Sequence, residues 1–234
     1  MKISIFGLGY VGCVSIGCLA KKGNIITGVD INEKKVELIK NSKSTITETG
    51  LDELIEEGVN KGLISATVNV EEAIRDSQIA IICVGTPNSE NGTLDMSYIY
   101  DVCKEIGKIL KNKKDFLTIS IRSTVMPGTI DNVIKIIEKD SGKTHSKDFA
   151  VVLNPEFLRE GNAVKDFFTP PFTIVASDSV KGIEEVSKLF SFLNSEILIV
   201  DISTAELIKL LNNSFHALKV AFANEIGRLS KVLK

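Results

Sequence analysis

The sequence predicts an α/β fold with a doubly wound, mostly parallel sheet, followed by one long helix. Three observations support this prediction. Short apolar runs rich in β-branched residues recur through the first 200 residues, as expected of strands buried on both faces. Amphipathic stretches of helical period separate these runs, and such alternation is typical of parallel strands joined by right-handed crossovers. From Ser203 onward the pattern is helical without a break.

The expected elements follow one another along the first 200 residues, which we assign to one domain (1–200). The expected strands are Ile3–Phe6, Ile25–Val29, Ile79–Val84, Leu117–Ile121, Ala150–Leu153, Phe172–Ala176 and Ile197–Val200. The expected helices are Val11–Lys21, Glu33–Lys40, Leu51–Gly58, Ser97–Leu110, Gly128–Glu138 and Lys181–Leu193.

The remaining residues, 201–234, are predicted to form a helix that begins a central helical domain. Ser203 and Glu206 have the spacing of a capping box, in which two side chains satisfy free N–H groups of the first turn. The helix from Thr204 onward would be about 46 Å long at about 1.5 Å per residue. Because it is apolar on most sides, we expect it to pack against a partner subunit or a further domain. This chain would then carry a truncated form of the central domain.

Composition excludes several classes of protein. The 234 residues include 28 Lys and Arg against 30 Asp and Glu, a net charge of −2, whereas a nucleic-acid-binding surface needs a basic excess. No apolar run approaches 18 residues, so we expect no association with the membrane through a spanning helix. The four cysteines match no zinc spacing, and we expect no metal site. Buried free thiols in a reducing cytoplasm are favoured over disulfides.

A glycine-rich turn after the first expected strand is the strongest chemical signal. It reads Gly7-Leu8-Gly9-Tyr10-Val11-Gly12, and Asp30 stands at the end of the next strand. Gly7 permits the tight turn, Gly9 lets the backbone approach a pyrophosphate, and Gly12 allows close helix–strand packing. The Asp30 carboxylate would accept hydrogen bonds from ribose hydroxyls and repel a 2′-phosphate. The sequence therefore predicts a Rossmann-like domain that binds NAD rather than NADP.

Two further strand ends carry hydroxyl groups. Thr86 lies in Cys83-Val84-Gly85-Thr86-Pro87, and Thr124 lies in Arg122-Ser123-Thr124-Val125-Met126-Pro127-Gly128. Ligands of open α/β sheets bind beyond the carboxyl ends of strands, so both threonines are placed to meet the cofactor. A plain turn explains Thr86 equally well. Pro127 fits a first helical position, with Ser123 or Thr124 near the cap.

A charged segment follows the strand Ala150–Leu153. It places Glu156 and Glu160 four residues apart, with Arg159 between them. The spacing alone favours a surface turn with an ion pair made by Arg159 over a catalytic pair of carboxylates.

Polar residues gather on one side of the long helix. Lys209, Asn213, His216 and Asn224 fall within an arc of about 80° at about 100° per residue. A solvent-exposed face usually carries Glu and Lys four residues apart, whereas this one mixes Lys, Asn and His. We therefore favour a ligand-facing stripe, in which Lys209 and Asn213 could hold a developing oxyanion.

Taken together, ISIFGLGYVG, CVGTP, RSTVMPGT, NPEFLREG and the AELIK…N…H helix resemble the UDP-glucose/GDP-mannose dehydrogenase family over the whole chain. The stretch HALKVAFANEIG is closer to the GDP-mannose members than to the UDP-glucose members. The resemblance implies a nucleotide-sugar 6-dehydrogenase that oxidises a sugar C6 hydroxyl to a carboxylate with two NAD⁺. A cysteine thiolate captures the aldehyde between the two hydride transfers.

The resemblance also implies roles for residues and a partner. The residues expected to contact NAD are Tyr10, Val11, Asp30, Lys35, Thr86 and Thr124. Thr124 and Glu160 would lie near the reacting centre, and Glu160 would handle water or protons. Lys209 and Asn213 would stabilise the oxyanion and hold the water, His216 and Asn224 would contact the substrate, and Glu156 would support them. The long helix would form a homodimer.

The chain departs from the family in two ways. Family members usually read Glu-Pro-Gly-Leu where Glu48-Thr49-Gly50-Leu51 stands here, which we interpret as a local loop change near the cofactor. The chain also has about half the family's length, so the nucleophilic cysteine and the nucleotide-sugar domain would lie beyond it, and we expect NAD binding without complete turnover. Two alternatives stay open: a β-hydroxyacid dehydrogenase, and a non-catalytic cofactor-binding or dimerisation module.

Overall fold

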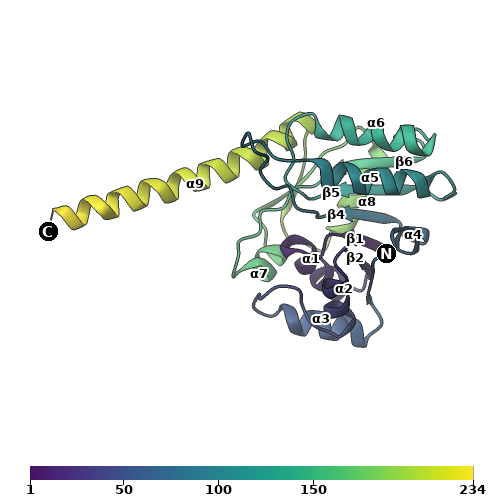
Figure 1. Ribbon diagram of the computed structural model, residues 1–234, viewed down its shortest axis with the longest axis horizontal. Helices are drawn as coiled ribbons and strands as arrows, with labels where there is room; N and C mark the ends of the chain where they lie inside the picture. The colour runs from purple at the N-terminus through teal and green to yellow at the C-terminus, as the bar shows by residue number, and fades with distance from the viewer. Residues whose placement is uncertain (234) are drawn as a thin grey trace.

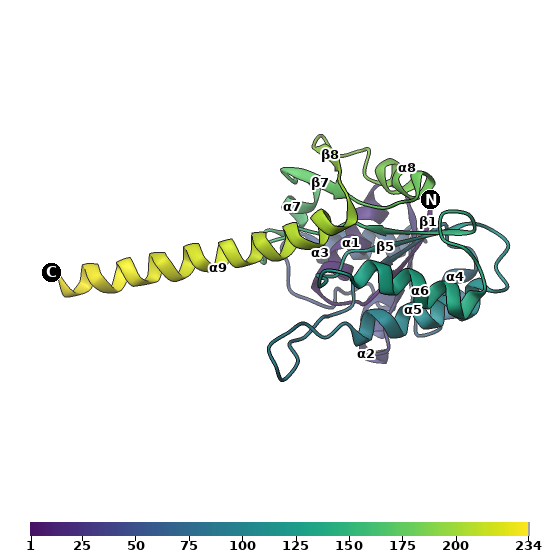
Figure 2. The ribbon, with the colours of Figure 1, turned by 90° about the horizontal axis from the view of Figure 1, so that it is seen from above.

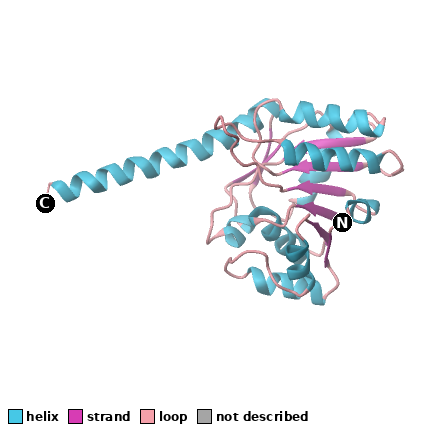
Figure 3. Ribbon diagram, in the orientation of Figure 1, coloured by secondary structure: helices cyan, strands magenta, loops and turns pink. Residues whose placement is uncertain are grey.

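The computed structural model describes residues 1–233, in which a six-stranded sheet has every neighbouring pair of strands parallel (Figure 3). The strand order is β3-β2-β1-β4-β5-β6, so the winding direction reverses between β1 and β4. At such a switch point the loops after two neighbouring strands diverge and leave a crevice for a ligand. The strands are β1 (Lys2–Phe6), β2 (Ile25–Val29), β3 (Ile64–Thr67), β4 (Ile79–Ile82), β5 (Leu117–Ile121) and β6 (Phe149–Leu153).

Helices cover both faces of this sheet (Figures 1 and 2). One face packs against α4 (Val70–Arg75), α5 (Ser97–Leu110) and α6 (Thr129–Ser141). The other packs against α1 (Tyr10–Lys21), α2 (Glu33–Lys40), α3 (Leu51–Asn60), α7 (Ala163–Phe168) and α8 (Val180–Leu189). The side chains of a strand alternate between the two layers: in β1, Ile3 and Ile5 belong to one core and Phe6 to the other. The predicted doubly wound α/β fold is confirmed.

A second, two-stranded sheet extends the domain beyond β6. Its strands β7 (Phe172–Val175) and β8 (Glu196–Ile199) are parallel and flank α8 in sequence. Two backbone hydrogen bonds between Leu153 and Ala176, of 2.8 and 3.0 Å, attach this sheet to the end of β6 in antiparallel fashion. The chain is thereby led back to the carboxyl edge of the main sheet, where the last helix starts.

The last helix, α9 (Ile202–Val232), begins two residues earlier than predicted. Its N-cap is Asp201, whose carboxylate accepts a 2.8 Å hydrogen bond from the Thr204 amide. The expected capping box of Ser203 and Glu206 is therefore wrong. Glu206 is buried and caps α6 instead, accepting hydrogen bonds from the Gly128 amide (2.7 Å) and the Ile130 amide (2.9 Å).

Helix α6 also starts at a different residue from the one expected. Gly128, with φ of +85°, is the N-cap, and α6 begins at Thr129, so Pro127 lies before the helix and not at its first position. Ser123 makes no cap and donates a 2.6 Å hydrogen bond to the Val84 carbonyl. This bond ties the loop after β5 to the loop after β4.

Most of α9 projects away from the domain (Figure 1). Residues 211–233 are all exposed, including large apolar side chains. These are Leu211, Phe215, Leu218, Val220, Phe222, Ile226, Leu229, Val232 and Leu233. Within residues 1–233, no helix has both the length and the apolar character that a membrane crossing requires.

Candidate functional site

The glycine-rich turn lies at the switch point of the sheet, between the ends of β1 and β4. Gly7 has φ of +93°, and a Cβ there would come within 2.7 Å of the Cys83 carbonyl oxygen. A Cβ on Gly12 would lie 1.8 Å from the Gly7 carbonyl oxygen. Both positions therefore exclude any side chain. A Cβ on Gly9 would meet nothing within 4 Å, so the turn leaves open space above the first N–H groups of α1.

Those N–H groups are free to bind a ligand. Gly9 is the N-cap of α1, no side chain caps the helix, and its first turn carries no acidic residue. A helix N-terminus with free N–H groups and its positive dipole end favours an anion such as a pyrophosphate. The open space at Gly9 and this uncapped end fit the phosphates of a dinucleotide.

Asp30 is held rigidly one strand away. Its carboxylate accepts hydrogen bonds from the amides of Leu8 (2.7 Å) and Asn32 (2.9 Å), and the Lys35 ammonium lies 3.5 Å from it. The side chain is 9% exposed, which leaves an edge of the carboxylate available to a hydroxyl donor. Asp30 and Lys35 are thus brought together at the end of β2, beside the glycine-rich turn.

The other residues expected near the cofactor sit at the same sheet edge. Tyr10 and Val11 open α1 and are half-buried. Thr86 follows β4 and Thr124 follows β5, and both are half-buried. The hydrogen bond from Ser123 to the Val84 carbonyl holds these two loops side by side. The expected cofactor residues therefore all lie at the carboxyl edge of the sheet, around the switch point.

A cavity of about 450 Å³ lies between the loop after β6 and the start of α9. Inside it, the Lys209 ammonium is 3.1 Å from a Glu156 carboxylate oxygen, and both side chains are nearly buried. The Lys209 ammonium also lies 5.1 Å from the centre of the Phe157 ring. The polar residues that line the cavity are Arg122, Asn154, Glu156, Arg159, Asp166, Thr169, Thr173, Lys209, Asn212, Asn213 and His216.

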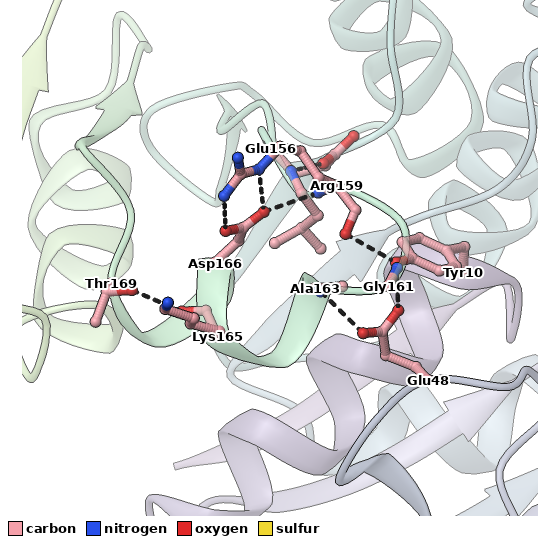
Figure 4. A network of polar contacts seen from close by, with 10 residues as sticks. Tyr10, Glu48, Glu156, Arg159, Gly161, Ala163, Lys165, Asp166 and Thr169 are labelled. Atoms are coloured by element: carbon pink, nitrogen blue, oxygen red, sulfur yellow. Dashed lines mark hydrogen bonds and ion pairs between the residues drawn. The ribbon is translucent and has the colours of Figure 1, made fainter.

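The charged segment after β6 is not the self-contained turn that its spacing suggested. Arg159 pairs with Asp166 on α7 through hydrogen bonds of 2.7 and 2.9 Å, while Glu156 pairs with Lys209 on α9 (Figure 4 shows the Arg159–Asp166 contacts). The hydrogen bond from Arg159 lowers the pKa of Asp166. Glu160 is exposed and does not line the cavity.

The predicted polar stripe on α9 is divided. Lys209, Asn213 and His216 line the cavity. Asn224 lies about 12 Å beyond His216 along the helix, at about 1.5 Å per residue. Asn224 is exposed and is not among the residues that line the cavity. Asn212 also lines the cavity, although the sequence analysis did not include it. It precedes Asn213 and lies at the edge of the same helical face.

The sequence reasoning also missed Arg122 as a cavity residue. Its guanidinium lies 5.8 and 5.2 Å from the ring centres of Phe167 and Phe190, and it donates a 2.5 Å hydrogen bond to Asn154. Burial lowers the pKa of Arg122. The signal was a charged residue directly after the buried strand Leu117–Ile121, where an unpaired charge is costly without such partners.

The cysteines are structural, as expected. Cys13, Cys18, Cys83 and Cys103 are all free and buried. Burial raises the pKa of both Cys18 and Cys83 to about 12, so these thiols are protonated at neutral pH and poorly nucleophilic.

Sheet order, glycine-rich turn and Asp30 together define a dinucleotide-binding domain of the Rossmann type. Residues 1–194 match the NAD binding domain of the UDP-glucose/GDP-mannose dehydrogenase family, and residues 203–234 match its central domain. The chain belongs to this family, and NAD is the dinucleotide of its matched domain.

Relatives agree with this assignment. GDP-mannose 6-dehydrogenase of Pseudomonas syringae pv. syringae is 47% identical over 234 residues, which are 100% of this chain and 53% of that protein. UDP-glucose 6-dehydrogenase TuaD of Bacillus subtilis is 37% identical over 97% of this chain and 48% of its own length. The chain thus spans about half the length of the curated relatives it matches.

Solved structures agree as well. The crystal structure of a ternary complex of GDP-mannose dehydrogenase from Pseudomonas aeruginosa superposes with a TM-score of 0.95 at 45% identity, over 97% of this chain and 52% of that one. A UDP-glucose dehydrogenase from Pyrobaculum islandicum gives a TM-score of 0.91 at 32% identity, over 96% of this chain and 52% of that one.

Proposed function

We propose that this chain is the NAD-binding portion of a cytoplasmic nucleotide-sugar 6-dehydrogenase, which oxidises the sugar C6 hydroxyl to a carboxylate with two NAD⁺. GDP-mannose is the favoured substrate and UDP-glucose the next. The preference for GDP-mannose is supported by several relatives named GDP-mannose 6-dehydrogenase at 44–47% identity, against 37% for the UDP-glucose enzyme.

The buried pair of Lys209 and Glu156 is the observation on which this proposal rests most directly. It sets a cationic group and a carboxylate in a cavity at the carboxyl edge of the sheet, the edge at which the expected cofactor residues also lie. Bound NAD⁺ supplies the hydride acceptor. A sugar hydroxyl in the cavity would lose its proton as hydride leaves, and the Lys209 ammonium and Asn213 amide would stabilise the negative charge that develops on oxygen.

The other expected site residues would bind the cofactor, the substrate or the water of the reaction. Thr124, at the end of β5, would contact both NAD and the reacting centre, and Glu156 would hold the Lys209 ammonium in place. Glu160 would accept a proton or orient water in the later hydrolysis, which requires its exposed side chain to turn toward the cavity. His216 and Asn224 would contact the nucleotide sugar.

We further propose that α9 forms a homodimer. The support is its exposed apolar side, which runs over more than four turns beyond the domain. An exposed apolar surface of this extent is typical of a protein–protein interface.

Calorimetric titration with NAD⁺ tests the cofactor part of the proposal. We expect the chain to bind NAD⁺ with micromolar to millimolar affinity, and Asp30→Ala to weaken binding at least tenfold because the ribose hydroxyls lose their acceptor. Asp101→Ala, which removes an exposed carboxylate on α5, is the matched control and should bind like the wild type. A folded wild-type chain that shows no binding would contradict the proposal.

A further inference from the structure

Glu48 makes three hydrogen bonds that join two distant segments of the chain (Figure 4). One carboxylate oxygen accepts from the Tyr10 hydroxyl at 2.6 Å and from the Gly161 amide at 2.9 Å. The other accepts from the Ala163 amide at 3.1 Å. Glu48 is 8% exposed, so its carboxylate is largely shielded from water.

The joined segments are the two that carry the expected chemistry. Tyr10 is the first residue of α1, directly after the uncapped glycine-rich turn. Gly161 follows Glu160, and Ala163 is the first residue of α7. The Tyr10 hydroxyl also lies 3.2 Å from the Arg159 carbonyl oxygen, so the phenol and Glu48 contact the same backbone segment.

The loop that bears Glu48 is itself fastened to the glycine-rich turn. Thr45 donates a 2.7 Å hydrogen bond from its hydroxyl to the Leu8 carbonyl, and its amide lies 3.4 Å from the Cys13 sulfur. Glu48 is therefore not a flexible side chain reaching across a gap. Its backbone is anchored on the cofactor side, and its carboxylate reaches the 161–163 segment.

An ionised carboxylate suits this position better than any neutral group. All three partners are donors, and the hydrogen bond from Tyr10 is the main cause that lowers the pKa of Glu48. A glutamine would present one acceptor oxygen and one NH₂ group, so in either orientation an NH₂ group would face a backbone N–H. At least one of the Gly161 and Ala163 amides would then lose its partner.

We propose that Glu48 is a positioning residue that fixes the 159–163 segment to the N-terminus of α1. When NAD⁺ binds at the start of α1, hydrogen exchange should then slow both there and in the segment that carries Glu160. This inference rests on the proposed function, because it uses Tyr10 as a cofactor contact and Glu160 as a residue of the reacting centre.

Hydrogen-exchange mass spectrometry with and without saturating NAD⁺ tests the proposal on the 234-residue chain. In peptides covering residues 158–166 of Glu48→Gln, we expect exchange at least tenfold faster than in the wild type, with unchanged exchange in β1 and β4. In the wild type NAD⁺ should slow exchange both at the start of α1 and in 158–166. In Glu48→Gln the slowing should remain at α1 and disappear from 158–166, which a merely structural role would not produce.

Two further variants make the test decisive. Tyr10→Phe keeps both amide contacts of Glu48, so the slow exchange of 158–166 without NAD⁺ should persist while its response to NAD⁺ falls. This variant also serves if Glu48→Gln does not fold. Glu53→Gln, an exposed acid on α3, is the matched control and should behave as the wild type.

The outcomes separate this inference from the proposed function. Unchanged exchange in Glu48→Gln, or an NAD⁺ response of 158–166 equal to that of the wild type, overturns the positioning role. If the wild type binds no NAD⁺, the proposed function and the coupled response fail together. The exchange rates measured without NAD⁺ then still decide whether Glu48 anchors the segment.

Discussion

The ammonium of Lys209 and the carboxylate of Glu156 form an ion pair of 3.1 Å, with side-chain exposures of 8% and 11%. Lys209 belongs to the first turns of α9, and Glu156 to the loop after β6, so the pair joins the two elements that enclose the cavity. Glu156 is held in addition by a 2.6 Å hydrogen bond from the Leu158 amide. The same contact therefore serves the site and the attachment of α9.

Breaking this pair should destabilise the domain. Lys209→Met leaves the Glu156 carboxylate buried without its cation, and removal of one partner of a buried pair costs about 3–5 kcal/mol. We expect a loss of that order in the free energy of unfolding, measured by urea denaturation. The double variant Glu156→Gln/Lys209→Met should recover part of it, because neither charge is then left alone.

Lys231→Met is the control for this measurement, because Lys231 is exposed on the same helix. It should leave the free energy of unfolding within about 0.5 kcal/mol of the wild type. A similarly small effect of Lys209→Met would contradict the stabilising role of the pair.

Glu206 should contribute to stability through a helix other than its own. Its carboxylate accepts hydrogen bonds from the Gly128 and Ile130 amides, and hydrogen bonds to a charged group are worth about 1.5–3 kcal/mol. We expect Glu206→Ala to lower the free energy of unfolding by at least that amount, and hydrogen exchange in the first turn of α6 to accelerate. Glu225→Ala, at an exposed position of α9, should change neither quantity appreciably.

Stability should also depend on pH through His145. Burial lowers the pKa of His145 below its ordinary value of 6.5, and its Nε2 atom has no partner within residues 1–233. The unfolded chain therefore binds this proton more tightly than the folded chain does. As the pH falls through about 6.5, the free energy of unfolding should decrease, and it should stop decreasing below the folded-state pKa of His145. Urea denaturation between pH 7.5 and 5.5 should show a smaller slope for His145→Asn. Equal slopes would contradict the assignment.

The proposed dimer predicts a clear change in molecular mass. Phe222 is 66% exposed on the part of α9 that lies beyond the domain. Light scattering at micromolar concentration should give a dimer for the wild type and a monomer for Phe222→Glu. Val180→Glu places the same charge on an exposed apolar residue of α8 and should remain dimeric. A monomeric wild type would count against the interface.

Most strands of the parallel sheet could be predicted because an apolar run of a few residues shows up in the local pattern. Runs such as Ile79–Ile82 are apolar throughout and flanked by turns, so burial on both faces is visible in four residues. Strand β3, with the sequence ISAT, carries one large apolar side chain, and its edge position leaves little pattern to recognise. The six-residue helices α4 and α7 are too short to show a helical period.

Site residues that belong to one contiguous sequence motif could be predicted. Residues whose role depends on contacts between distant parts of the sequence could not. Asp30 and the glycines lie within one β-α-β unit, and the structure places them together. Glu206 and Glu48 each bind amides more than 75 residues away in the sequence. Local spacing assigned Glu206 to its own helix, since the competing partner on α6 appears only in three dimensions.

The first turns of α9 set the direction of a long projecting helix. Among the residues of this helix, Ala205, Glu206 and Lys209 alone are buried in the described part of the chain, and they fix its direction within two turns. The helix has 31 residues. At about 1.5 Å per residue it reaches about 46 Å, so a tilt of about 10° at the root would displace its far end by about 8 Å. A small change in the direction of α9 at Lys209 would therefore be magnified at its far end, within the surface proposed for the homodimer.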